Sequence, residues 1–99
     1  MSEKVEDLSI EWTDDDGVLV TKQLDMAILS KGAWATVMFL YQDLDRKTGE
    51  YNPPKVRMER YRKTGGKYRS QSRFKISSEK QARLIIQHLQ GWFPPEEDA

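Results

Sequence analysis

The 99-residue sequence has no cysteine and only one histidine. Without cysteine it forms neither a disulfide framework nor a thiolate metal site, and one histidine leaves carboxylates to supply most ligands of any metal. No apolar run approaches the roughly 18 residues of a membrane span. The first residues also lack the basic start and apolar core of a signal peptide. We therefore expect no metal or cofactor, no membrane contact, and a cytoplasmic protein, with association with the nucleoid as an alternative.

Local signatures of catalysis are also missing. The sequence has no G-x-x-x-x-G-K-[ST] loop, no G-x-G-x-x-G loop and no local serine–histidine–aspartate signature. TGGK (64–67) is similar to part of a phosphate-binding loop, but it lies in a predicted hairpin and not before a helix. TDDDG (13–17) lacks the spacing and the distal glutamate of a calcium loop. We predict that the protein is not an enzyme and takes no small-molecule substrate.

The net charge is zero, but the charges are segregated along the chain. Residues 1–30 hold two lysines against eight acidic residues, and residues 31–90 hold fourteen Lys or Arg against five Asp or Glu. Residues 91–99 add three acids. Two interpretations are open. Either the acidic and basic segments meet in the fold and cancel, or a basic face remains available for a polyanionic partner.

Hydrophobic alternation predicts an α+β fold, in which an antiparallel sheet of about five strands is followed by one helix packed on the sheet. The predicted strands cover residues 8–12, 18–24, 33–44, 55–63 and 67–76, and the helix covers residues 79–90. Residues 25–32 fit either one helical turn or an irregular link. We predict a single domain over residues 1–93 and a disordered acidic tail over residues 94–99.

The most apolar segment, residues 33–44, has two interpretations. As a strand it places Trp34 and Met38 on one face and Val37 and Phe39 on the other, so that both faces would be covered. As a helix, Trp34, Val37 and Met38 also form a stripe. The β-branched and aromatic residues, and Gly32 before them, favour a central strand.

The predicted helix has explicit signals at both ends. Ser78 is a favourable N-cap, and Gln81 three residues later completes a capping box. Gly91 suits the left-handed position that follows a helix, with Trp92 packing back on Ile86. The predicted buried stripe consists of Ala82, Ile85, Ile86 and Leu89.

The basic segment 55–75 carries nine Lys or Arg and one acidic residue. Val56 and Met58 of its first strand must lie beside Phe74 and Ile76 of its second, or the apolar face is lost. Simple two-residue loops give the wrong parity, so we expect an odd-length loop or a bulge. The Gly65–Gly66 pair would supply the positive φ that such a loop needs.

The opposite face of this hairpin is predicted to be a cationic working surface. Like charges on neighbouring strands repel by a few tenths of a kcal/mol per opposed pair, and Glu59 is the only acid on this face. A phosphate backbone would release counterions from these cations, and a tyrosine would stack on bases. Trp34 and Trp92 are expected in the core, with Arg60 and Arg62 at its rim. The candidate nucleic-acid-binding residues are Arg57, Tyr61, Lys67, Arg69, Arg73 and Lys75.

Two basic strands, KVRMERYRK (55–63) and KYRSQSRFKIS (67–77), lead into a helix entry, FKISSEKQARLI (74–85). This order resembles the C-terminal domain of the positive cofactor four family of transcriptional coactivators, including its small bacterial relatives, mainly over residues 55–92. The resemblance implies a homodimer with helices in its interface, whose curved sheets bind single-stranded DNA. By position, it implies contacts at the same six candidate residues.

We therefore predict a single-stranded nucleic-acid-binding module that acts in transcription, replication or repair. DNA is the first expectation and RNA the alternative. A second class of function stays open, in which the acidic N-terminal hairpin of one chain pairs with the basic hairpin of another in a self-assembly. Within one chain, the acidic segment would compete with nucleic acid for the basic face.

Overall fold

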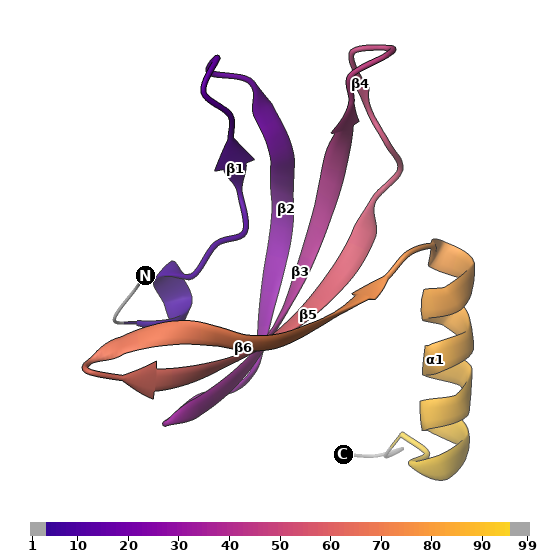
Figure 1. The fold of residues 1–99 in the computed structure, drawn as a ribbon. Helices are drawn as coiled ribbons and strands as arrows, with labels where there is room; N and C mark the ends of the chain where they lie inside the picture. The colour runs from indigo at the N-terminus through magenta and orange to yellow at the C-terminus, as the bar shows by residue number, and fades with distance from the viewer. Residues whose placement is uncertain (1–3, 96–99) are drawn as a thin grey trace.

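A computed structural model describes residues 4–95 of the chain. Its main feature is a curled antiparallel sheet in the order β1-β2-β3-β5-β6, with β4 paired to β3 off this path, followed by one helix (Figure 1). This confirms the predicted α+β fold. The elements are a 3-10 helix Val5–Asp7, β1 Trp12–Thr13, β2 Leu19–Ser30, β3 Trp34–Asp45, β4 Glu50–Tyr51, β5 Lys55–Thr64, β6 Lys67–Ile76 and α1 Glu79–Trp92.

The central strand β3 settles the ambiguity at residues 33–44 in favour of a strand. It pairs with β2 on one side and β5 on the other. β2 continues through residues 25–30, where the sequence suggested a helical turn or a link. The register of β2 on β3 shifts at Leu24 and again at Leu29, so both are bulge residues. Because each bulge resets the period of two, simple alternation stops at residue 24 while the strand continues.

The predicted strand at residues 8–12 is mostly absent. Only Trp12 and Thr13 pair with β2. Upstream, the side chain of Gln23 substitutes for a ladder partner, because its Oε1 accepts a hydrogen bond from the Ile10 N–H at 3.0 Å. This frees residues 5–10 to cross the sheet, and Val5, Leu8 and Ile10 are buried against it.

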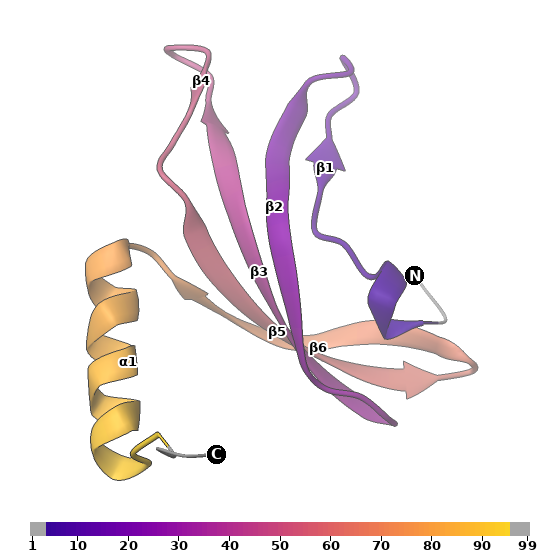
Figure 2. The ribbon, with the colours of Figure 1, turned by 180° about the vertical axis from the view of Figure 1, so that it is seen from behind.

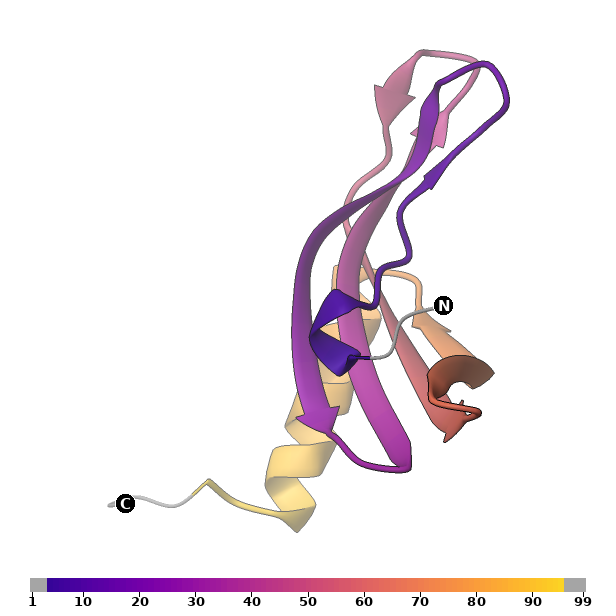
Figure 3. The same ribbon diagram turned by 90° about the vertical axis from the view of Figure 1, so that its left-hand side faces the viewer.

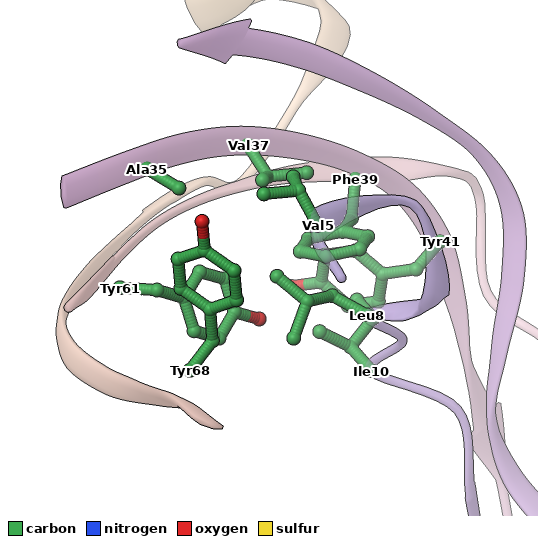
Figure 4. Close-up of a cluster of buried hydrophobic side chains, with 9 residues drawn as sticks. All are labelled: Val5, Leu8, Ile10, Ala35, Val37, Phe39, Tyr41, Tyr61 and Tyr68. Carbon is green, nitrogen blue, oxygen red and sulfur yellow. The ribbon is translucent and has the colours of Figure 1, made fainter. Parts of the chain in front are cut away.

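The hydrophobic core lies on one face of the sheet, which we call the covered face (Figure 4). Residues directly opposed in neighbouring strands project to the same side, so the registers define this face. Residues 5–10 cover this face. It is formed by Ala35, Val37, Phe39 and Tyr41 of β3, Arg57, Glu59 and Tyr61 of β5, and Tyr68, Ser70, Arg73 and Lys75 of β6.

The reverse side, which we call the open face, is mostly exposed within residues 4–95. The 3-10 helix that covers the other face is far from α1, at the opposite side of the molecule (Figures 2 and 3). On the open face, Trp34 is 42% exposed and Phe74 is 55% exposed, whereas Ile76, near the start of α1, is buried. The open face is formed by Trp34, Thr36, Met38 and Leu40 of β3, Val56, Met58, Arg60 and Arg62 of β5, and Lys67, Arg69, Ser72, Phe74 and Ile76 of β6.

The helix α1 begins as predicted and ends differently. The Ser78 hydroxyl accepts a hydrogen bond from the Gln81 N–H at 3.1 Å, and the Gln81 side chain reaches back to the N–H of Ser77, one residue earlier than in a capping box. Gly91 lies inside the helix without a positive φ. The chain therefore has no left-handed turn to fold Trp92 back, and the Trp92 ring lies 6.0 Å from that of His88.

The helix does not bury the stripe that its sequence predicts. It extends away from the sheet beyond its first turn (Figure 1), and none of its residues is buried. Ile86, Leu89 and Trp92 are exposed. The predicted packing of the helix on the sheet is therefore limited to its start. There, a hollow of about 510 Å³ separates Ala82 from Leu40 and Val56.

Two further predictions concern membrane spans and the acidic tail. Over residues 4–95, the structure contains no helix long and apolar enough to span a membrane. Of the predicted acidic tail, residues 96–99 lie outside the described part of the chain.

Candidate nucleic-acid interface

The turn of the basic hairpin is a two-residue loop. Thr64 pairs with Lys67, and Gly65 and Gly66 have φ values of +61° and +80°. Two successive positive φ values are those of the tight turn that matches the twist of paired strands. The parity mismatch that this loop creates is corrected further along, where Arg60 pairs with Ser72 and Tyr61 with Ser70. Gln71 is therefore the bulge residue.

The position of the bulge brings the apolar residues together as predicted. Val56 lies opposite Ile76, and Met58 lies opposite Phe74. A bulge or an odd-length loop was predicted, but the residues of β6 were assigned to faces by one uninterrupted alternation. Because the bulge lies within the strand, the parity of β6 reverses at Gln71.

This reversal corrects the prediction of a single cationic face. Lys67 and Arg69 lie on the open face, whereas Arg73 and Lys75 lie on the covered face with Arg57. All four cations of β6 are exposed. The structure thus divides the six candidate residues between the two sides of one hairpin.

Tyr61 was wrongly predicted to point outward. It is only 5% exposed and belongs to the core with Tyr68 (Figure 4). Burial raises the pKa of the Tyr61 hydroxyl to about 12, and the nearby Glu59 carboxylate adds to the shift. The Tyr68 hydroxyl donates a hydrogen bond to the Gly32 carbonyl at 2.7 Å. Neither ring is placed to stack on a base.

Arg57 is also committed within the fold. Its Nε lies 2.6 Å from Glu59 Oε1, and the Arg57 side chain is only 15% exposed. The Ser70 hydroxyl donates to the other oxygen of Glu59 at 2.9 Å. A buried carboxylate is tolerable when it is paired and hydrogen-bonded in this way. Arg57 therefore neutralises a buried acid and is not a free cation.

On the open face, two arginines lie over the ring of Trp34. The Arg60 Cζ is 4.7 Å from the centre of the Trp34 ring, and the Arg62 Cζ is 5.3 Å from it. Arg62 is directly opposite Trp34 on β3 and opposite Arg69 on β6. Guanidinium groups over an indole gain from the ring quadrupole, which partly offsets their mutual repulsion. We call this cluster the tryptophan–arginine patch, consisting of Trp34, Arg60, Arg62, Lys67 and Arg69.

The acidic first part of the chain does meet the basic part, but within residues 4–95 it does so outside the basic hairpin. Glu6 is bonded to Lys31, and Asp14 is bonded to Arg46 at 2.9 Å. A backbone N–H of Val18 and the Arg46 guanidinium lower the pKa of Asp14. Within residues 4–95, no ion pair involves a cation of the patch or of β6.

The open face also has an apolar part nearer α1. A shallow hollow of about 210 Å³ lies beside the patch, between Met58, Arg60 and Phe74. Leu40 and Val56 continue this apolar surface to the hollow at the start of α1. One side of the sheet thus combines a cationic aromatic end with an apolar end.

No protein-family model, curated protein or solved structure matches this chain. The resemblance to the positive cofactor four family stays a prediction from the sequence. Over residues 4–95, the structure also contains no group of three or more His, Cys, Asp or Glu arranged to hold a metal ion.

The sequence prediction missed the patch because it took the face of β5 that carries Val56 and Met58 for the core face. The core lies on the opposite face, with Tyr61. Trp34 was expected in the core, and Arg60 and Arg62 at its rim. One signal was available: Arg60 and Arg62 share a parity with Val56 and Met58. A strand face with two arginines is a poor core face, since a fully buried arginine needs a partner.

Proposed function

We propose that the protein binds single-stranded nucleic acid, DNA in the first instance, through the tryptophan–arginine patch. The observation that carries the proposal is an exposed indole with two arginines over its ring, at the end of the open face away from α1, where no segment of residues 4–95 covers the sheet. Aromatic rings and cations on an open sheet are the elements with which proteins bind single strands.

The patch offers both interactions that a single strand needs. Among residues 4–95, Arg62, Lys67 and Arg69 have no acidic partner, so phosphates would neutralise them and release counterions. The exposed Trp34 ring would stack on a base, which contributes about 1–3 kcal/mol per base. Stacking accepts every base, so we expect little sequence preference.

Replacing Trp34 tests this assignment. We expect Trp34→Ala to weaken binding of a fluorescent oligo-dT by about 5- to 150-fold, the equivalent of about 1–3 kcal/mol. Fluorescence anisotropy at two salt concentrations measures both the affinity and its salt dependence. An oligo-rU of equal length compares RNA with DNA.

The matched control is Trp12→Ala, which removes an exposed indole on β1, away from both the patch and α1. This variant should bind oligo-dT as the unmodified protein does at concentrations well above those of self-association. Equal affinity of the Trp34→Ala protein and the unmodified protein would place the site elsewhere. Absence of binding at low salt would refute the function itself.

We also propose that the protein acts as a homodimer with α1 in the interface, as the family resemblance implies. Support comes from the apolar side chains of α1, which a single chain leaves in water. A surface of this kind marks an interaction site. The hollow between Ala82 and Val56 continues the same apolar surface onto the sheet.

Charged substitutions on α1 test the dimer. Ile86→Glu with Leu89→Glu should shift the mass measured by sedimentation towards the 11.6 kDa of one chain. Gln87→Glu, on the polar side of the helix, adds one negative charge without altering the apolar stripe and should leave the dimer intact. A monomeric unmodified protein, or a double variant that stays dimeric, would contradict the proposal.

The self-assembly alternative has one geometric point in its favour. β1 and β6 form opposite edges of the sheet, so the acidic and basic hairpins cannot pair with each other within one chain. Pairing between chains would give a closed dimer where it is reciprocal, and rings or filaments where it is head-to-tail. Salt-sensitive assembly without nucleic-acid affinity would favour this alternative.

A further inference from the structure

The outer strand of the basic hairpin is an edge of the sheet. β6 pairs with β5 on one side, and no strand of residues 4–95 lies on its other side. β6 contains four cations and no acid. Edge strands commonly carry charges that discourage pairing with another strand, and such charges need no particular arrangement. Here the arrangement is specific, because the bulge at Gln71 divides them into two pairs.

Each pair is exposed on its own side of the edge. Lys67 and Arg69 extend the tryptophan–arginine patch on the open face. Arg73 and Lys75 lie on the other side, beyond the tyrosines that residues 5–10 cover. The one acid near them, Glu59, is already bonded to Arg57 and Ser70. The positive charge therefore continues around the edge without an anion to interrupt it.

The distance between the two pairs is short. Arg73 lies four positions after Arg69, which is about 13 Å at the rise of an extended strand. Single-stranded nucleic acid bends over such a length, whereas duplex DNA has a persistence length of about 150 bp and does not. A single strand can therefore turn around the sheet edge, whereas a duplex cannot.

We propose that a single strand bound at the patch continues over the β6 edge at Gln71 and contacts Arg73 and Lys75 on the covered side. This inference rests on the proposed function and adds its path and the cause of its selectivity. The crossing favours single strands over duplexes, since a duplex contacts the open-face pair alone.

Paired charge removals test the path in the full-length protein. One variant combines Lys67→Gln with Arg69→Gln, and the other combines Arg73→Gln with Lys75→Gln. Lys47→Gln with Lys80→Gln removes two exposed, unpaired cations away from the hairpin and serves as control. The probes are an oligo-dT of about 20 nucleotides and a duplex of equal length, measured by anisotropy over a salt series.

Each phosphate contact contributes about 0.7 to the slope of log K against log salt for a single strand. We expect both hairpin variants to lower the oligo-dT slope by about 1.4, and the control to leave it unchanged. With the duplex, only the Lys67/Arg69 variant should lower the slope. Thermal melting before binding would confirm that these surface variants fold.

An Arg73/Lys75 variant with the unmodified oligo-dT slope would overturn the path and leave the patch intact. An equal loss for oligo-dT and duplex would overturn the proposed origin of selectivity. Failure of the proposed function has a separate signature, in which the unmodified protein does not bind oligo-dT at low salt.

Discussion

The two faces of one sheet treat similar residues in opposite ways. On the covered face, Tyr61 is buried beside the Arg57–Glu59 ion pair. On the open face, Trp34 is exposed beside two arginines that have no acidic partner within residues 4–95. Each face therefore combines an aromatic ring with arginine. The role of each combination follows from the segment that lies over it and not from the residue types.

The comparison shows how one hairpin combines structure and an exposed charge. The covered face meets the usual rule for a buried ion, because Glu59 has both a guanidinium and a hydroxyl donor. The open face breaks the usual rule for neighbouring strands, because Arg62 faces Arg69. The covered face supplies the stability on which the open face depends.

The largest expected difference comes from aromatic truncations on opposite sides of β3. Phe39→Ala removes a fully buried ring and should lower the free energy of unfolding by about 3–5 kcal/mol. Trp34→Ala should lower it by less than half as much, because that ring is partly exposed. Urea denaturation of both variants measures the contrast. Equal losses would mean that the open face is a second core face.

A smaller loss is expected when the buried ion pair is broken. Glu59→Ala leaves the Arg57 guanidinium without its partner in a largely buried place and should cost about 3 kcal/mol. Asp25→Ala, at an exposed acid of β2, provides the comparison and should change little. The same denaturation experiment measures both. A Glu59 variant as stable as the Asp25 variant would show that the pair contributes nothing to stability.

The buried tyrosine predicts a dependence on alkaline pH. Because the pKa of Tyr61 is about 12 in the folded chain and about 10 in an unfolded one, the unfolded state releases this proton first. Stability is then fully present below pH 10 and falls by about 2–3 kcal/mol as pH rises to 12. Comparing denaturation of Tyr61→Phe and the unmodified protein across this window isolates the effect. Parallel pH profiles would refute the assignment.

Much of the fold is readable from the sequence because it depends on local patterns. β6 and the N-cap at Ser78 were predicted at the positions where they occur, and the strand assignment of residues 33–44 was correct. The contact of Val56 with Ile76 follows from the need to keep apolar residues together. The candidate site was predicted less well. Lys67 and Arg69 were named, but Arg60 and Arg62 were expected at the rim of the core and Trp34 inside it.

The sequence by itself determined the strands, the helix start, the segregation of charge and the need for a bulge in the basic hairpin. Each of these depends on the period of two, on a cap, or on composition. Only the tertiary structure decided which face is the core. Residues 5–10 cover one side, and the bulge at Gln71 reverses the parity of β6. Both depend on contacts between segments far apart in the chain, which local periodicity does not contain.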